Sequence, residues 1–293
     1  MVYATANGVK NSMTRRIIVA LADTHAGHKL GLCNPQVMLP EEDEQGVVHW
    51  VTPPITFVQK WLWECYEEDR AAVKELAQGD PITILHNGDL TWGKRYPDGL
   101  MTTRIVDQYI IAESNLLPWF LLPNVTTVRL MHGTQSHESG EGSAPIMVAK
   151  GLHDMGRDIK TAQHGLYDVD GVLFDVAHHG PSLGIRHWLR GRTLRYMTQS
   201  LMQDCIARGK KPPDVILRAH RHELVWITER YMNYTCEAIA LPAYCGMTHY
   251  AQQATQSAFL LTCGLVALVI EDDRVTGVHP FAREVDLRTE ETL

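Results

Sequence analysis

RIIVALADTH, residues 16–25, joins an apolar run to two polar side chains. Residues 16–22 are rich in β-branched side chains and stop abruptly at Asp23, as a buried strand does. Asp23 and His25 then follow with one residue between them. The sequence therefore predicts a buried strand that presents a carboxylate and an imidazole just beyond its carboxyl end.

Four further apolar runs end in the same way, each followed by a polar cluster rich in His or Asp. The runs and clusters are residues 81–85 before 88–89, 125–131 before 132–138, 172–177 before 178–180, and 215–217 before 220–222. Ligands of open α/β sheets gather beyond the carboxyl ends of the strands. One His at a strand end is usually a hydrogen-bonded structural residue, but five clusters in succession predict one shared site.

Helical periodicity alternates with these strands. Helices are expected at residues 55–77, 102–120, 144–155 and 184–207. After residue 223, adjacent strand-like runs follow at residues 224–228, 235–240, 259–270 and 275–278, with a turn at Asp272 and Asp273. This order predicts an α/β fold in which two packed mixed β-sheets are flanked by helices.

No repeat or linker divides the sequence, so we expect one domain over residues 1–293. An acidic, Pro-containing stretch at residues 33–54 predicts an irregular excursion over the surface of that domain.

Composition narrows the classes of function. A formal net charge of −7 argues against a protein that coats nucleic acid through bulk charge, although a local basic patch can still bind phosphate. The N-terminus lacks the apolar core of a signal peptide, and the longest apolar run, residues 258–270, is too short for a membrane span. We therefore expect a cytoplasmic protein with no membrane partner. Six scattered cysteines without a C-x-x-C pair predict buried, reduced thiols.

The donor types of the five clusters are typical of a hydrolytic metal site. Imidazole suits Zn, Fe, Ni and Mn-type centres, and carboxylates can bridge two cations. Along residues 23–222 the motif order D-x-H, G-D, an H-E cluster, H-H and H-x-H resembles the calcineurin-like metallophosphoesterase superfamily. The resemblance implies a four-layer sandwich of helices and sheets. It also implies two divalent ions (Mn, Zn, Fe, Ni or Mg), whose metal-bound hydroxide attacks the phosphorus of a phosphate ester in line.

The same resemblance assigns six metal ligands, residue by residue. Those of one metal are Asp23, His25 and His222, those of the second are His178 and His220, and Asp89 is the bridging carboxylate that takes part in catalysis. His179 follows a predicted ligand directly, so it either orients that ligand or packs at the strand end.

The fourth motif departs from the superfamily, which usually has Gly-Asn-His, with the Asn as a ligand and the His as a catalytic acid. No Asn is present here. One alignment places Ser136 at the Asn position, with His137 and Glu138 following. Another places Gly133 and Thr134 on Gly-Asn and resembles a Gly-Thr-x-x-His variant of phage-type members. We expect His137 to enter the site, either as a metal ligand or as the acid that protonates the leaving group.

Substrate binding has a candidate in a basic stretch after His178. Arg186, Arg190 and Arg192 carry guanidinium groups that match phosphate geometry. An exposed helix face explains the same charges.

These patterns favour hydrolysis of a phosphodiester, with a nucleotide or nucleic acid among the candidate substrates. The alternatives are a phosphomonoesterase and a non-catalytic metal-binding scaffold of the same fold. A P-loop at residues 88–94 is disfavoured, because Arg95 stands where a Ser or Thr would hold Mg²⁺.

Overall fold

A six-stranded mixed sheet has the first strand of the chain near its centre. In this computed structural model, which describes residues 15–140, 143–182, 189, 191–255 and 259–291, the strand order is β13-β12-β1-β4-β5-β6. The strands are β1 (Arg15–Leu21), β4 (Ile82–His86), β5 (Val125–Met131), β6 (Asp158–Ala162), β12 (Leu260–Glu271) and β13 (Arg274–Asp286). β1, β4, β5 and β6 run parallel, whereas β12 is antiparallel to β1 and to β13.

A second, five-stranded mixed sheet packs on the first. Its order is β10-β11-β9-β8-β7. The strands are β7 (His164–Val169), β8 (Val172–Ala177), β9 (Val215–Arg218), β10 (Val225–Tyr231) and β11 (Tyr234–Ala240). β8, β9 and β11 run parallel, and the two edge strands are antiparallel to their neighbours.

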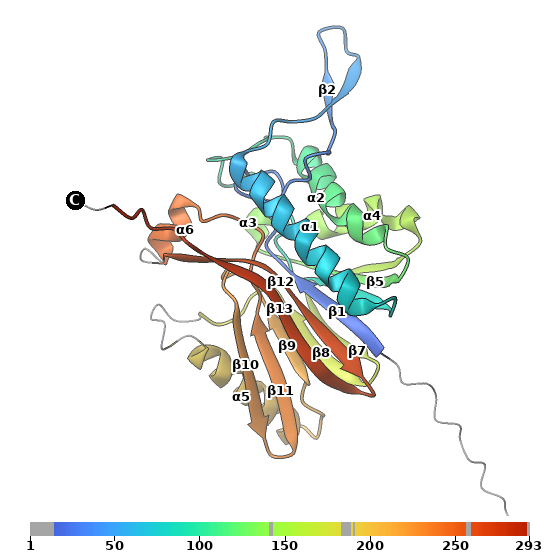
Figure 1. Cartoon of the computed structure of the whole chain (residues 1–293), viewed down its shortest axis with the longest axis vertical. Coiled ribbons are helices and arrows are strands. Elements are labelled where there is room, and N and C mark those ends of the chain that lie inside the picture. Colours follow the sequence, from blue (N-terminus) through green and yellow to red (C-terminus); the bar gives the residue numbers. More distant parts are fainter. Residues whose placement is uncertain (1–14, 141–142, 183–188, 190, 256–258, 292–293) are drawn as a thin grey trace, which may run out of the picture.

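Three apolar layers hold these elements together. Between the sheets, alternate residues of β1, including Ile18 and Ala20, pack with Phe174 and Leu217. On the outer face of the first sheet, a larger core forms against α1 (Phe57–Ala77), α2 (Ile105–Phe120) and α4 (Ser143–Gly151). On the second sheet, a smaller core forms against α5 (Arg192–Ala207). The predicted α/β class, with two packed mixed sheets flanked by helices, is confirmed (Figure 1).

Local sequence explains where the first helix begins and ends. Thr56 and Gln59 form a capping box, in which each side chain accepts the other's backbone N–H at 3.1 and 2.9 Å. Gln78 closes α1 in a left-handed conformation.

Several elements differ from the sequence-based expectations. Residues 33–54 are not wholly irregular, because β2 (Leu39–Glu42) and β3 (Val48–Val51) pair there as a projecting antiparallel hairpin (Figure 1). The expected helix at residues 144–155 stops at Gly151 and is followed by a short 3-10 turn, His153–Met155. β6, β7, α3 (Gln135–Glu138) and α6 (His249–Ala254) were not predicted. Residues 183–188 and 190 of the expected helix at 184–207 lie outside the described residues.

None of the described helices is both long enough and apolar enough to cross a membrane.

The carboxyl ends of the two sheets are joined by Asn87, which follows β4. Its side-chain amide donates to the carbonyl oxygen of Ala177 at the end of β8 (3.1 Å), and its own carbonyl oxygen lies 2.7 Å from Nδ1 of His178. The polar clusters after β1, β4, β8 and β9 therefore meet in one place.

The loop after β1 is fixed from the helical side by Asn115 of α2. Its buried side chain accepts the Asn34 N–H (2.8 Å) and donates to the carbonyl oxygen of Leu32 (2.9 Å). Because both partners are backbone groups, the course of the loop depends on this side chain.

Candidate metal centre

One donor group forms where the end of β1 meets the loop after β9. Nε2 of His25 and Nε2 of His222 lie 3.1 Å apart, and they lie 3.8 and 3.4 Å from Oδ1 of Asp23. The other carboxylate oxygen of Asp23 accepts the backbone N–H of His220 (3.1 Å). Three donor atoms from residues nearly two hundred positions apart therefore converge on one point.

A second donor group surrounds Asp89, which follows β4. Oδ2 of Asp89 lies 3.1 Å from Nε2 of His178 and 4.0 Å from Nδ1 of His220. Asp23, Asp89 and His178 also form a compact set, with one ligand atom from each within 4.8 Å of the others. Asp89 therefore lies between the two donor groups.

The backbone of this centre is unusual. Eleven non-glycine residues of the described chain have positive φ, and five of them are the proposed ligands Asp23, His25, Asp89, His220 and His222. Non-glycine residues rarely adopt this region, Asn, Asp and His more often than the others, and such conformations cluster at functional sites. Backbone hydrogen bonds hold two of them: Asp23 N–H donates to Gly88 and His25 N–H donates to Asp89, both at 3.0 Å.

Hydrogen bonding sets the orientation of His178. Nδ1 of its ring donates to the Asn87 carbonyl oxygen, which turns Nε2 toward Asp89. Burial lowers the pKa of His178, but the charge and hydrogen bond of Asp89 and the charge of Asp23 together outweigh burial and raise it to about 9. A divalent cation would compete with a proton for Nε2.

The other ionisable groups are shifted by burial and by one another. Burial raises the pKa of Asp23, but the imidazoles of His222 and His178 together outweigh burial and lower it to about 2. Burial and the nearby His137 hold the pKa of His25 well below its usual value, so this imidazole is neutral, the form that binds metals.

The donor set fits divalent cations. Asp23 and Asp89 are buried, and Oδ1 of Asp23 makes no hydrogen bond within the described chain. No described Lys or Arg forms an ion pair with either carboxylate. Buried charges of one sign are costly without a counter-charge, and oxygen and imidazole nitrogen donors suit Mn, Zn, Fe or Ni.

The fourth motif has Thr134, not Ser136 or His137, among the donors of the second group. Oγ1 of Thr134 lies 3.2 Å from Oδ2 of Asp89, 3.2 Å from Nδ1 of His220 and 3.4 Å from Nε2 of His178. Its backbone N–H donates to Oδ1 of Asp89 (2.6 Å). Thr134 therefore lies among the donors around Asp89.

His137 lies on the other side of the centre, in contact with the first donor group. Its ring is 4.7 Å from that of His25, centroid to centroid, and Nδ1 donates to the Trp92 carbonyl oxygen at 2.7 Å. Nε2 is therefore the ring nitrogen left for a ligand or a substrate. One ligand atom each from His25, Asp89 and His137 lies within 4.8 Å of the others.

His179 lies beside the second donor group. Its Nε2 lies 3.5 Å from Oγ1 of Thr134, and it forms a potential metal-binding group with His178 and His220. His28, by contrast, uses both ring nitrogens in backbone contacts to Leu30 and Asp98 and stacks on Trp92.

The predicted arginine stretch is only partly described. Arg186 and Arg190 lie outside the described residues. Arg192 is exposed at the start of α5, where its Nε donates to the hydroxyl of Tyr196 (3.1 Å).

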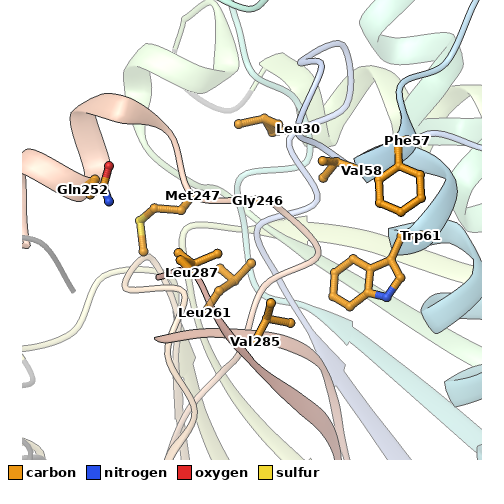
Figure 2. Close-up of a pocket in the computed structure, with 10 residues that line it drawn as sticks. All are labelled: Leu30, Phe57, Val58, Trp61, Gly246, Met247, Gln252, Leu261, Val285 and Leu287. Carbon is orange, nitrogen blue, oxygen red and sulfur yellow. The ribbon is translucent and has the colours of Figure 1, made fainter. Parts of the chain in front are cut away.

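Sequence reasoning missed three features near the centre. Cys245 is buried beside His25 and His222. Lys94 and Arg95 line a pocket of about 350 Å³ together with Gln135, Ser136, Ser139 and Gly140. A separate apolar pocket of about 580 Å³, shown in Figure 2, contains none of the proposed ligands. No spacing in the sequence singles out these residues, because loops distant along the chain bring them together.

No known family pattern matches the chain. No curated protein matches it either. Among solved structures, an archaeal protein described as a novel phosphodiesterase is 13% identical, with 92% of this chain and 99% of that chain covered and a TM-score of 0.42. A single mutant of Vps29 from Entamoeba histolytica is 10% identical, with 93% and 99% covered and a TM-score of 0.36.

The sulfate thiohydrolase SoxB of Thermus thermophilus is 13% identical over 93% of this chain, with a TM-score of 0.39. This chain spans 56% of that protein. Likenesses of this size carry no functional conclusion, which has to come from the donor residues themselves.

Gly133→Ala tests how closely the fourth motif packs on Asp89. A Cβ at this position would clash with Oδ1 and the backbone nitrogen of Asp89. The carboxylate has to move, so bound metal, measured by elemental analysis, should fall while the circular dichroism spectrum is kept. Gly277→Ala is the matched control, because its Cβ would meet only movable side-chain atoms of His279 and Val269. Full metal content in Gly133→Ala would contradict the assignment of Asp89.

Proposed function

We propose that this chain is a metal-dependent phosphoesterase that hydrolyses phosphodiesters with the help of two divalent cations. The observation that carries the proposal is the pair of buried carboxylates, Asp23 and Asp89, each facing its own histidines. Asp23, His25 and His222 would hold one cation, and His178, His220 and Thr134 the other, with Asp89 shared between them. This donor order and the two-sheet fold support membership of the calcineurin-like metallophosphoesterase superfamily.

The chain's own groups have separable roles. When bound, the two cations supply a nucleophile from water near neutral pH and neutralise charge on the phosphoryl oxygens. His137 has Nδ1 fixed to the Trp92 carbonyl oxygen, which aims Nε2 away from that backbone and leaves it free to protonate the leaving oxygen. The backbone N–H of Thr134 donates to Oδ1 of Asp89 and so fixes the orientation of the shared carboxylate.

A basic pocket beside His137 favours a diester over a monoester. Lys94 and Arg95 are exposed, and neither forms an ion pair with a described acidic residue. Lys94 and Arg95 belong to the loop after β4. The same loop carries Thr91, whose Oγ1 donates to the His137 carbonyl oxygen (2.6 Å). In a chain of net charge −7, these two cations attract anions locally, which suits a neighbouring phosphate of a nucleotide or nucleic acid.

The paired esters para-nitrophenyl phosphate and bis-para-nitrophenyl phosphate test the reaction class. We expect turnover that tracks added Mn²⁺, Ni²⁺ or Zn²⁺ and prefers the diester. Turnover of the Asp89→Asn variant should fall by more than about 100-fold. Loss of a residue that only supports a metal ligand costs up to about 100-fold, and Asp89 is itself a proposed ligand. The control is Asp98→Asn, an exposed carboxylate. Preference for the monoester would identify a phosphatase, and bound metal without turnover would identify a scaffold; either result contradicts the proposal.

Lys94→Ala combined with Arg95→Ala tests the substrate class. For a single-stranded oligonucleotide, KM should rise roughly tenfold, equivalent to about 1.4 kcal/mol. The slope of log KM against log salt should fall by about 1.4, at ~0.7 per lost phosphate contact. Kinetics with bis-para-nitrophenyl phosphate should not change, because this ester has no second phosphate.

The matched control replaces Lys60 and Lys74, two exposed lysines of α1. An unchanged salt slope in the Lys94 and Arg95 variant would remove the case for a polyanionic substrate.

A further inference from the structure

Cys245 reaches the metal centre from a loop that follows β11. Gly31 and Cys245 form an isolated antiparallel β-bridge, and the Gly246 N–H donates to the Leu30 carbonyl oxygen at 2.7 Å. This pairing joins the loop after β11 to the loop after β1, which carries His25. Cys245 is fully buried as a result.

The thiol lies with the first donor group. One ligand atom from each of His25, His222 and Cys245 lies within 4.8 Å of the other two. Two atoms bound to one tetrahedral zinc ion stand about 3.6 Å apart, given Zn–S and Zn–N distances of about 2.3 and 2.1 Å. Two nitrogens at about 2.1 Å from the same ion stand about 3.4 Å apart, and the two imidazole nitrogens are 3.1 Å apart. The thiol sulfur, within 4.8 Å of both, lies near enough to complete the set of ligands.

A second observation points to the same position. Oδ1 of Asp23 is buried, makes no hydrogen bond within the described chain and faces Nε2 of both His25 and His222. Within the described chain, the Cys245 thiol donates to the carbonyl oxygen of the next residue, Gly246, at 3.4 Å, which is a weak hydrogen bond. Oδ1 of Asp23 and the thiol of Cys245 therefore both lie at the first donor group without a strong hydrogen bond.

Cys245 belongs to none of the three apolar cores of the described chain. Figure 2 shows that Leu30 and Gly246, its neighbours in the β-bridge, line the apolar pocket, and Cys245 is not among the residues that line it. Among the described residues, no other cysteine belongs to a group that could hold a metal ion. Cys236, for comparison, is equally buried but packs in the core under α5.

We propose that Cys245 is a ligand of the first metal position, together with Asp23, His25 and His222. The inference rests on the proposed function and adds the identity of the metal at the first position. Thiolate is a soft ligand that selects zinc and similar ions over manganese or magnesium, and a coordinating thiol is deprotonated. The second position, with His178, His220, Asp89 and the hydroxyl of Thr134, has nitrogen and oxygen donors alone. The two positions therefore select different metals, with zinc at the first.

Cobalt substitution tests the inference with a spectroscopic readout. The full-length protein is stripped of metal and titrated with Co²⁺, and its absorbance is recorded. We expect a near-ultraviolet charge-transfer band of the kind that thiolate gives on Co²⁺. The band should be lost in Cys245→Ser and in Cys245→Ala and kept in the matched control Cys236→Ser. Zinc affinity should fall at least about tenfold in both Cys245 variants.

The possible failures are distinguishable. Visible cobalt bands without the charge-transfer band in the wild-type protein would overturn the role of Cys245 and leave the phosphoesterase proposal standing. No bound cobalt at all would overturn both. Circular dichroism shows whether each variant folds. The wild-type spectrum decides between these outcomes even where a variant does not.

Discussion

The structure depends on the burial of two carboxylates that face histidines but no described Lys or Arg. Asp23 and Asp89 are almost completely buried, and no described Lys or Arg pairs with either of them. Burying an isolated carboxylate costs far more than a fold of ordinary stability can supply. Histidines and backbone N–H groups offset part of that cost, and cations at the two donor groups would offset the rest. The buried carboxylates need histidines around them, and the loops after β8 and β9 carry His178, His220 and His222. The ends of β1 and β4 therefore face the ends of β8 and β9.

The fold also holds strained backbone at this place. A non-glycine residue in a sparsely populated conformation costs about 1–3 kcal/mol, and five of the proposed ligands have positive φ. Two apolar cores, one on each face of the first sheet, fix the strands from which these residues emerge. Asn87 fixes the position of the second sheet relative to the first at the centre, because its side chain and carbonyl oxygen connect β4 to the end of β8. The centre is therefore organised before a metal binds, which favours tight binding and a defined geometry.

Sequence predicted the strands that end at the centre more completely than it predicted the rest. The runs before Asp23 and Asp89 are continuous and apolar and end at polar residues. This pattern was sufficient to predict both strands. β7 was missed because Leu166 is exposed and breaks the alternation of polar and apolar residues, and the β2–β3 hairpin was missed because acidic residues and Pro40 dominate it. The choice of Thr134 over Ser136 depends on distances across loops, which one-dimensional spacing does not contain. Cys245 was interpreted as an ordinary buried thiol for the same reason.

Anomalous diffraction from crystals grown with Mn²⁺ and Zn²⁺, recorded on both sides of each absorption edge, tests the central claim most directly. The account predicts two anomalous peaks, one beside Asp23, His25 and His222 and the other beside His178 and His220, with Asp89 in contact with both ions. A single peak away from Asp89, or no peak in crystals that keep this arrangement of side chains, would contradict a two-metal centre.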